Sequence, residues 1–530
     1  MNRKKMLQML SEVEQQREKY RLGSGPEEVK KQHKKGKLTA RERVERLFDP
    51  GTFHELDLWS FPLRTFFEID ERFSPGDAVV IGYGKVDGRT VMTYAHDFTI
   101  LAGTQSTVQH AKVTKVIETA IKMGVPYVGI LDSAGIRVQD MMGEPGPRPP
   151  ADGSGLHGSG SFMYSPPLAS GVVPQIALML GPQFAGASYS PILKDFLFMR
   201  QGPSYMALVS PTVIKEVTGA EVTYEEIGSA AVHAEISGTC DLVVESDEEG
   251  LDRCRKLLGY LPSNWKEKPP FVDLGDDPER REDELLDVVP LDSSQGYDMR
   301  HLISLVVDGG EFFEIKPFYA QNVITGFARL AGQSVGIVAS NPAVLNGAVD
   351  MNSSDKEARF IRFCDAFNIP LVFLADTIGY LPDVEQERAG IERHAAKVMY
   401  AICEATVPKI TVYLRNCSGN GELAMGTEQM GVDLVLAWPA ARIGMIDPEL
   451  AVNAIYEREI KTAANPEEIK MSKIEDFIKK YNNLYHAGAR GLFQDIIDPR
   501  ETRPLLTKAL GWFAGKKEER PWRKHGNIPL

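Results

Sequence analysis

Apolar and polar residues alternate between positions 78 and 97, which predicts a pair of strands. AVVIGYGKV (78–86) is rich in β-branched residues, and its apolar and polar positions alternate in the second half. Asp87-Gly88 is typical of a two-residue hairpin turn, and RTVMTYAHD (89–97) is the expected return strand. This part of the chain therefore begins as an antiparallel hairpin.

The apolar spacing then changes from two to three and four, which predicts a helix. One face of that helix carries Val113, Val116, Ile117, Ala120 and Ile121. The apolar run YVGILD (127–132) follows as a buried strand, and a glycine-containing turn ends it. The local order is thus β-β-α-β-turn.

The same succession recurs 244 residues later. VPYVGILDSAGI (125–136) matches IPLVFLADTIGY (369–380), and GYGKVDGRTV (82–91) matches GFARLAGQSV (326–335). So many matches at one offset, over about 50 residues, indicate an internal duplication.

The helix of the second copy carries its own start signal. Lys112 in the first copy falls on Lys356 in the second, so the helices align. Ser354 and Glu357 predict a capping box at the start of the second helix.

A second block repeats at a shorter offset of 234 residues. VVPQIALMLGPQFAG (172–186) matches TVPKITVYLRNCSGN (406–420), so the first copy holds about ten extra residues. We place them in the Pro- and Gly-rich stretch 141–162, expected to be an irregular loop beside the active-site entrance. Each copy then reads β-β-α-β-turn-α-β-turn-α, which predicts an α/β fold in layers.

Length and composition place this duplicate among ordinary globular proteins. At 530 residues the chain exceeds one hydrophobic core, and the polar stretch 265–290 marks the junction of the copies. We predict domains at 1–270 and 280–530. A net charge of −13 argues against general nucleic-acid binding, although local basic residues can still hold a small anion.

The chain termini and cysteines bear on its location. No apolar run is long enough to span a bilayer, and the start lacks the apolar core of a signal peptide, so we expect a cytoplasmic protein. The first residues predict a surface amphipathic helix, with its apolar side at Met6, Leu7, Leu10 and Val13. Five cysteines without a CxxC pair indicate neither a disulfide framework nor a metal site.

The search for side-chain catalysis finds little. GxSxG, HExxH and Walker motifs are absent from the sequence. His96 and His110 are candidate bases, but a lone histidine is more often structural. Asp132 and Asp376 precede glycine turns, and we favour a helix-capping role for them over a catalytic one.

Two small-residue turns remain as candidates for chemistry. They are GPQFAGASYS (181–190) and RNCSGNGELA (415–424), one in each copy. Small residues after a buried strand allow close approach to the backbone. Two converging backbone N–H groups there could hold a developing oxyanion.

Long stretches resemble one enzyme family. They include ARERVERLFDPGTFHELD, DFTILAGTQS, DMNSSDKEARFIRFCDAFNIPL and RPWRKHGNIPL, and the likeness runs from about residue 10 to the end. The chain resembles the carboxyltransferase subunit of biotin-dependent acyl-CoA carboxylases, including the propionyl-CoA carboxylase β, methylmalonyl-CoA decarboxylase α and transcarboxylase large subunits. The resemblance implies two tandem crotonase-like domains, each a ββα superhelix.

The resemblance also implies an activity and an assembly. A carboxyl group would move between biotin, carried on a separate carrier protein, and the α-carbon of a short acyl-CoA such as propionyl-CoA or methylmalonyl-CoA. The family forms hexamers, in which each site lies between the N-terminal domain of one subunit and the C-terminal domain of its partner. A biotin carboxylase or decarboxylase subunit is the further partner, coenzyme A belongs to the substrate, and no metal is involved.

Site residues follow from the resemblance by position. The expected backbone N–H donors for two oxyanions are Ala185, Gly186, Asn420 and Gly421. The expected substrate-binding residues are Ala134, Gly135, Ile136, Arg137, Gly419 and Leu423. The family scheme uses no side-chain base, because the biotin N1 anion removes the α-proton of the acyl-CoA.

The chain departs from the family pattern at these turns. The family's GPCAGGAVYSP is GPQFAGASYSP here, RKAYGGAY is RNCSGNGE, and GFLPG is GYLPD. An unusual acyl-CoA substrate therefore stays open, as do the same subunit in a sodium-pumping decarboxylase and a non-catalytic homologue in a carboxylase complex. A biotin-independent hydratase or isomerase would need a side-chain acid, for which Glu422 and Glu387 are the nearby candidates.

Overall fold

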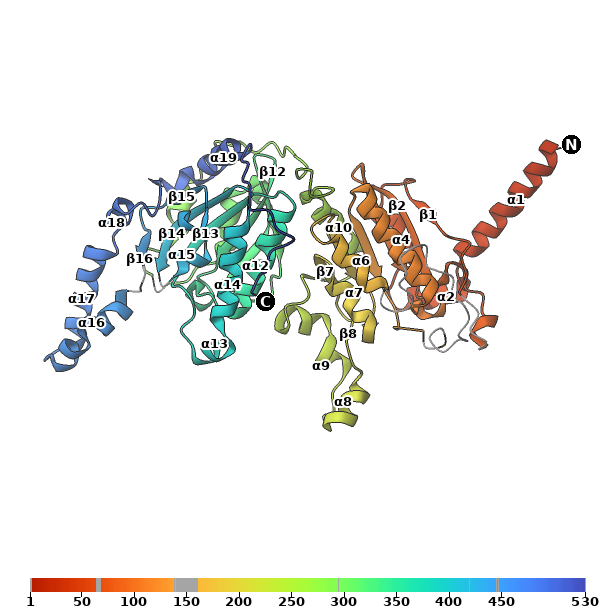
Figure 1. Cartoon of the computed structure of the whole chain (residues 1–530), viewed down its shortest axis with the longest axis horizontal. Coiled ribbons are helices and arrows are strands. Elements are labelled where there is room, and N and C mark those ends of the chain that lie inside the picture. Colours follow the sequence, from red (N-terminus) through yellow and green to blue (C-terminus); the bar gives the residue numbers. More distant parts are fainter. Residues whose placement is uncertain are drawn as a thin grey trace. The chain divides into compact units, whose positions relative to one another are not determined.

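The structure is a computed structural model that describes residues 2–62, 68–137, 139, 161–293, 295–418, 420–444, 446 and 448–529. The chain divides into two compact units, Met1–Glu267 (unit 1) and Lys268–Leu530 (unit 2). Each unit has its own sheet with helices packed on it (Figure 1).

The sheet of unit 1 has the strand order β1-β2-β3-β4-β5-β7-β9 in the described residues. The strands are β1 His54–Leu56, β2 Val79–Val86, β3 Arg89–His96, β4 Tyr127–Leu131, β5 Gln175–Met179, β7 Phe196–Arg200 and β9 Leu242–Val244. The first three strands pair antiparallel and the others parallel. A two-stranded sheet, β6 Gln183–Phe184 with β8 Met206–Ala207, lies beyond the end of β5.

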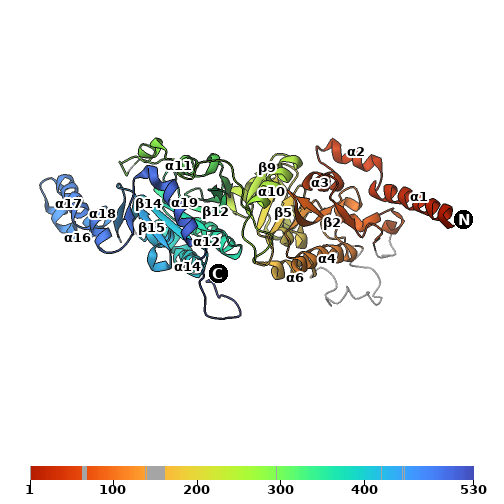
Figure 2. The ribbon, with the colours of Figure 1, turned by 90° about the horizontal axis from the view of Figure 1, so that it is seen from above.

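Helices cover both faces of this sheet. The helices of unit 1 within the described residues are α1 Asn2–Arg21, α2 Pro26–Lys34, α3 Ala40–Leu47, α4 Thr107–Met123, α6 Ser161–Ala169, α7 Tyr189–Ile192, α8 Pro211–Thr218, α9 Tyr224–Gly228 and α10 Asp247–Tyr260. Figure 2 shows α4 and α6 on one face and α3 and α10 on the other. The core under α4 is built by Val113, Val116, Ile117 and Ala120, as the spacing predicted.

The main path of the unit 2 sheet runs β10-β11-β12-β13-β14-β15-β17, and β16 pairs with β14. The strands are β10 Phe313–Ile315, β11 Val323–Leu330, β12 Gln333–Ser340, β13 Leu371–Thr377, β14 Lys409–Ser418, β15 Leu434–Ala437, β16 Arg442–Gly444 and β17 Asp495–Ile496. The pairings β10–β11 and β11–β12 are antiparallel, and those from β12 onward are parallel.

The helices of unit 2 include pairs that cover the two faces of its sheet, as in unit 1. Within the described part of this unit the helices are α11 Met299–Val306, α12 Met351–Ala366, α13 Val384–Ala389, α14 Ile391–Glu404, α15 Gly421–Ala424, α16 Pro448–Thr462, α17 Pro466–Tyr481, α18 Leu484–Ala489 and α19 Thr502–Phe513. Figure 2 shows α12 and α14 on one face of the sheet, with α11 and α19 on the other. Apolar residues of α11 and α19 share a core with the strands.

The predicted duplication is confirmed element by element. β2 and β11 start 244 residues apart, and the same offset separates the starts of β3 and β12, of α4 and α12, and of β4 and β13. Isolated bridges Gln105–Ile136 and Val349–Tyr380 also correspond at this offset. β5 and β14 start 234 residues apart, as expected for the second block.

Details of the backbone repeat as well. The predicted hairpin turn is present, with φ of 50° at Asp87 and 78° at Gly88. The buried Lys112 donates to the carbonyls of Gly76 and Val79, and Lys356 likewise donates to the carbonyls of Tyr319 and Val323. Each ammonium group therefore ties the start of a long strand to a helix.

The predicted capping box at Ser354 and Glu357 is wrong. Asp350 is the N-cap of α12, and it exchanges hydrogen bonds with Ser353. The aspartate reaches the N3 amide one turn before the predicted position, so Glu357 lies inside the helix and is fully buried.

Two other predictions concern the surface. The N-terminal helix is present as α1, which has no buried residue and extends away from its sheet (Figure 1). The stretch 141–160 of the predicted loop lies outside the described residues, and Ser161 already begins α6. Within the described residues, every helix is too short or too polar to span a lipid bilayer.

Candidate active site

The small-residue turn of unit 1 lies against the glycine turn that follows β4. The chain passes from β6 into a short 3-10 helix, Ala185–Ser188, with φ of 53° at Ala185. A Cβ placed on Gly186 would be 3.3 Å from the Ile136 Cδ1 atom, and one on Gly135 would be 3.6 Å from the Phe184 carbonyl oxygen. The structure thus brings together two predicted groups of residues far apart in sequence.

Unit 2 repeats this contact. β14 ends at Ser418, Asn420 has φ of 67°, and Gly421 begins α15. A Cβ on Gly421 would be 2.5 Å from Thr377 Cγ2 and 3.3 Å from the Gly379 nitrogen.

The other predicted substrate-binding residues differ in how deeply they are buried. Leu423 is half-buried in α15, Ala134 is exposed, and Gly419 lies outside the described residues. The first N–H groups of a helical turn have no acceptor within that turn. At Ala185, Gly186 and Gly421 they are therefore of the kind that can hold an oxyanion.

Buried aspartates support both turns, and their predicted helix-capping role is wrong. Asp132 is fully buried and accepts hydrogen bonds from Lys37 Nζ at 2.6 Å and Arg43 Nη1 at 2.9 Å. A Cβ on Gly181 would be only 1.9 Å from Asp132 Oδ1, so this carboxylate lies directly behind the start of the unit 1 turn. The carboxylate oxygens of Asp132 therefore accept hydrogen bonds from these two cations and do not cap the start of a helix.

Asp376 supports the turn of unit 2 in the same way, through different hydrogen-bond partners. It accepts from Arg415 Nε at 3.0 Å, from the Tyr297 hydroxyl at 2.9 Å and from the backbone N–H of Asn416 at 2.9 Å. Burial raises the pKa of Asp376, while the Arg415 guanidinium opposes that shift. The hydrogen bond to Asn416 fixes the end of β14 just before the turn.

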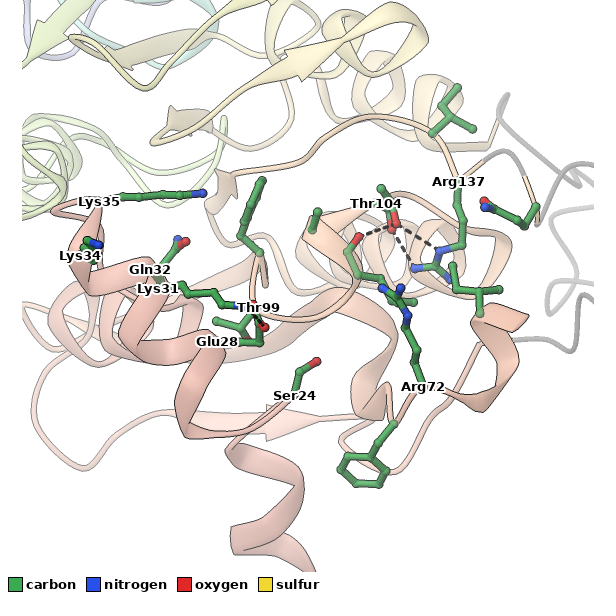
Figure 3. A pocket seen from close by; sticks show the side chains of 17 residues that line it. Ser24, Glu28, Lys31, Gln32, Lys34, Lys35, Arg72, Thr99, Thr104 and Arg137 are labelled. Carbon is green, nitrogen blue, oxygen red and sulfur yellow. Dashed lines mark hydrogen bonds and ion pairs between the residues drawn. The ribbon is translucent and has the colours of Figure 1, made fainter. Parts of the chain in front are cut away.

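A basic pocket adjoins the unit 1 turn (Figure 3). Its volume is about 1220 Å³, and Ile136 and Arg137 line it. Cationic side chains enter it from two sides, Lys31, Lys34 and Lys35 at α2 and Arg72 opposite (Figure 3). The arrangement suits a ligand with anionic groups.

The cations of this pocket differ in availability. Arg137 is 2% exposed and already pairs with Asp77 at 2.8 Å, and it also donates to Thr104 (Figure 3). Lys31 pairs with Glu28 at 2.6 Å, whereas Lys34, Lys35 and Arg72 have no ion pair among the described residues. They are the charges left to meet an anion.

Sequence reasoning missed these lysines. The run KKQHKKGK (30–37) holds five lysines in eight residues, which was the available signal. Its lysines serve two purposes, since Lys37 pairs with buried Asp132 while Lys34 faces the pocket.

The candidate bases are constrained by their surroundings. His96 is buried, its Nδ1 contacts Gln183 Nε2 at 3.2 Å, and burial lowers its pKa to about 3. His110 is also buried, with Nε2 3.3 Å from Gln105 Oε1. Both positions agree with a structural role.

The two candidate acids lie in different environments. Glu387 is exposed on α13, away from any burial that would tune a catalytic acid. Glu422 is half-buried directly after Gly421, and burial raises its pKa. Only Glu422 is therefore placed to influence the unit 2 turn.

Comparisons with known proteins identify the family. The model described as "Carboxyl transferase domain" matches residues 31–528. Methylmalonyl-CoA decarboxylase subunit alpha of Veillonella parvula is 44% identical, covering 97% of each chain. The methylmalonyl-CoA carboxyltransferase 12S subunit of Propionibacterium freudenreichii subsp. shermanii is 43% identical, covering 98% of this chain and 97% of that one.

Solved structures agree with the sequence relatives. A crystal structure of transcarboxylase 12S, a hexamer assembly with methylmalonyl-coenzyme A and methylmalonic acid bound, aligns with a TM-score of 0.92 and 43% identity over 98% of both chains. The expected pair of crotonase-like domains is confirmed by this likeness. With a family match over nearly its whole length and relatives of this identity, the chain belongs to the carboxyl transferase family of enzymes.

Proposed function

We propose that the chain moves a carboxyl group between biotin, borne by a separate carrier protein, and the α-carbon of a short acyl-CoA. The observation that carries this proposal is the repeated turn, which places a small-residue peptide segment over a buried aspartate in each unit. A transfer between two substrates needs two such places, and the duplication supplies one for each.

Unit 1 is the proposed site of the acyl-CoA. Its basic pocket offers Lys34, Lys35 and Arg72 for the phosphates of coenzyme A. Ile136 lines the same pocket and contacts Gly186, so a ligand anchored there reaches the turn. The N–H groups of Ala185 and Gly186 would then stabilise negative charge on a thioester oxygen.

Unit 2 is the proposed site of biotin. The Asn420–Gly421 turn is the counterpart of the unit 1 turn, and its N–H groups would stabilise charge on the ureido oxygen. Biotin supplies the transferable carboxyl group when it is bound. The chain's own contribution is to orient both substrates and to hold the charge that develops on them.

The relatives support the choice of acyl-CoA substrate. Methylmalonyl-CoA and propionyl-CoA are named for several of them, and these are the acyl-CoAs we propose here. The relative from Veillonella is named as a decarboxylase subunit. It supports the alternative in which the same subunit works in reverse with decarboxylase partners.

The proposed assembly is a cytoplasmic homo-hexamer with a biotin carrier and a biotin carboxylase as partners. Its support is the hexamer described for transcarboxylase 12S. A site shared between unit 1 of one subunit and unit 2 of another requires at least a dimer.

The decisive experiment is an acyl-CoA panel assayed with free biotin and with a biotinylated carrier. We expect carboxyl transfer that depends on biotin and is fastest with propionyl-CoA or methylmalonyl-CoA. Hydration or isomerisation of an unsaturated acyl-CoA without biotin, abolished by Glu422→Gln, would replace this proposal with an acid-base enzyme.

A further inference from the structure

Three polar side chains of unit 2 bury atoms that have no hydrogen-bond partner among the described residues. Glu357 is 0% exposed, and neither of its carboxyl oxygens has a partner. The Tyr380 hydroxyl and Glu422 Oε2 are also buried without a hydrogen-bond partner among the described residues. Buried polar groups are almost always paired, so an orphaned one in a native protein calls for a ligand or a function.

These three groups gather beside the unit 2 turn. Gly379 lies beside Gly421, since a Cβ on Gly421 would be 3.3 Å from the Gly379 nitrogen, and Tyr380 and Glu422 are the next residues along each chain segment. Burial raises the pKa of the Tyr380 hydroxyl, and the nearby carboxyls of Glu357 and Glu422 raise it further. Glu357 thus reaches the same place from α12, the helix between β12 and β13.

The equivalent positions of unit 1 show which side chains the fold accepts there. By the repeat offsets, the counterparts of Glu357, Tyr380 and Glu422 are Val113, Ile136 and Ser188. Val113 packs in the core, and the Ser188 hydroxyl donates to the Ala185 carbonyl.

That hydrogen bond leaves Ser188 satisfied at 2.7 Å. The scaffold is therefore stable with apolar or locally paired residues at all three positions. Unit 2 alone places unpaired acids and a phenol there, which points to a requirement of its own site.

The protonation of the acids defines the ligand chemistry. Burial raises the pKa of Glu357 well above its usual range and also raises that of Glu422, which favours the neutral acids. A neutral carboxylic acid offers one O–H donor together with an acceptor oxygen, and a phenol does the same. Such a set matches an amide or urea edge, which presents N–H and C=O together, whereas a thioester has acceptors only.

We propose that Glu357, Tyr380 and Glu422 form a hydrogen-bonding subsite of unit 2 for a cyclic urea. In the function proposed above, on which this inference rests, that urea is the ureido ring of biotin. The three side chains bind and orient the ring, while the transfer itself stays with the backbone groups of the turn. Unit 2 is thereby specialised for a neutral donor-acceptor ring and unit 1 for an anionic thioester.

The test replaces each residue with its unit 1 counterpart. Glu357→Val, Tyr380→Ile and Glu422→Ser should each raise the KM for free biotin by about tenfold or more, because a paired hydrogen bond to the ligand is lost. Glu357→Gln and Glu422→Gln should stay within about threefold of the parent, since an amide also offers a donor and an acceptor.

Matched measurements separate binding from folding. The KM for the acyl-CoA should be unchanged in every variant, and the exposed Glu387→Gln in the same unit should change neither KM. Binding of 2-imidazolidinone, the bare cyclic urea, is followed by ligand-observed NMR and should weaken in the Val, Ile and Ser variants.

The outcomes distinguish this inference from the proposed function. Weaker urea binding in the counterpart variants supports the subsite even if the parent enzyme transfers no carboxyl group, a result that would refute only the function. Carboxyl transfer with an unchanged KM for biotin in those variants overturns the subsite alone. Equal losses in Glu422→Gln and Glu422→Ser would also overturn it, because they would indicate a proton-transfer role.

Discussion

Adding one methyl group at Gly421 tests the proposed role of the unit 2 turn. A Cβ there would be 2.5 Å from Thr377 Cγ2, against an ordinary carbon contact of about 3.5–4.0 Å. Relief of this clash requires a displacement of about 1 Å, and a misplacement of that size at a reacting centre typically costs about a hundredfold in rate. We therefore expect Gly421→Ala to lower kcat by about a hundredfold.

Two matched variants sharpen this expectation. Gly186→Ala in unit 1 meets only the flexible ends of two side chains, Ile136 Cδ1 at 3.3 Å and Met163 Cε at 3.9 Å, so it should be nearly silent. Adding Thr377→Ser to Gly421→Ala removes the clashing methyl group but keeps the hydroxyl that accepts the Gly379 N–H at 3.0 Å. The double variant should regain activity to within about tenfold of the parent, since the remaining contacts at 3.3 Å and 3.4 Å are only tight.

The assay is carboxyl transfer from acyl-CoA, after sedimentation has shown that each variant folds and assembles. Full activity in Gly421→Ala would mean that the position of this turn does not matter. Failure of Thr377→Ser to restore a well-folded Gly421→Ala enzyme would refute the steric reasoning.

Four other predictions follow from the same contacts. Gly186→Pro removes a backbone donor and should slow transfer by about a hundred- to a thousandfold; a folded variant with parental rate would exclude that N–H group as an oxyanion donor. Because burial holds the pKa of His96 at about 3, against 6.5 ordinarily, only the unfolded chain takes up this proton on acidification. Stability should therefore fall by about 2 kcal/mol from neutrality to about pH 5, and denaturation of His96→Gln should lack this share; an identical acid profile would contradict the assignment. Asp376→Asn leaves a buried guanidinium without its counter-charge and should destabilise by about 3–5 kcal/mol in denaturant titrations. As a control, Arg388→Gln breaks an exposed ion pair and should leave the free energy of unfolding nearly unchanged. An equal loss of stability in both variants would show that burial is not the cause of the loss. Sedimentation coupled to assays should find activity only in dimers or larger assemblies, and an active monomer would exclude a shared site.

The scaffold could be predicted from sequence because its signals are local and repeated. Asp87-Gly88 allows the positive φ that the hairpin needs, and the spacing from Val113 to Ala120 defines one helix face. The duplication doubled each signal, so an ambiguous strand in one copy could be checked against the other.

The site was predicted less completely because its contacts are not local. Sequence spacing cannot show that Asp132 meets Arg43, which is 89 residues away, so the aspartate was assigned to the nearest helix start. The capping box failed for a related reason, since Asp350 offers a carboxylate to the same helix one turn earlier. Burial of Glu357 was likewise invisible, because a glutamate in a helix is normally exposed.

The buried aspartates behind the turns have a consequence for how this protein tolerates genetic change. Peptide groups are common to nearly all residues, so the segments at Ala185 and Asn420 can vary in side chain without losing their N–H groups. Sensitivity to substitution then shifts to residues such as Asp132 and Arg415, which are buried and form the ion pairs behind those segments. Inactivating mutations should therefore map to the interior of each unit, and a survey restricted to pocket-lining positions would overlook most of them.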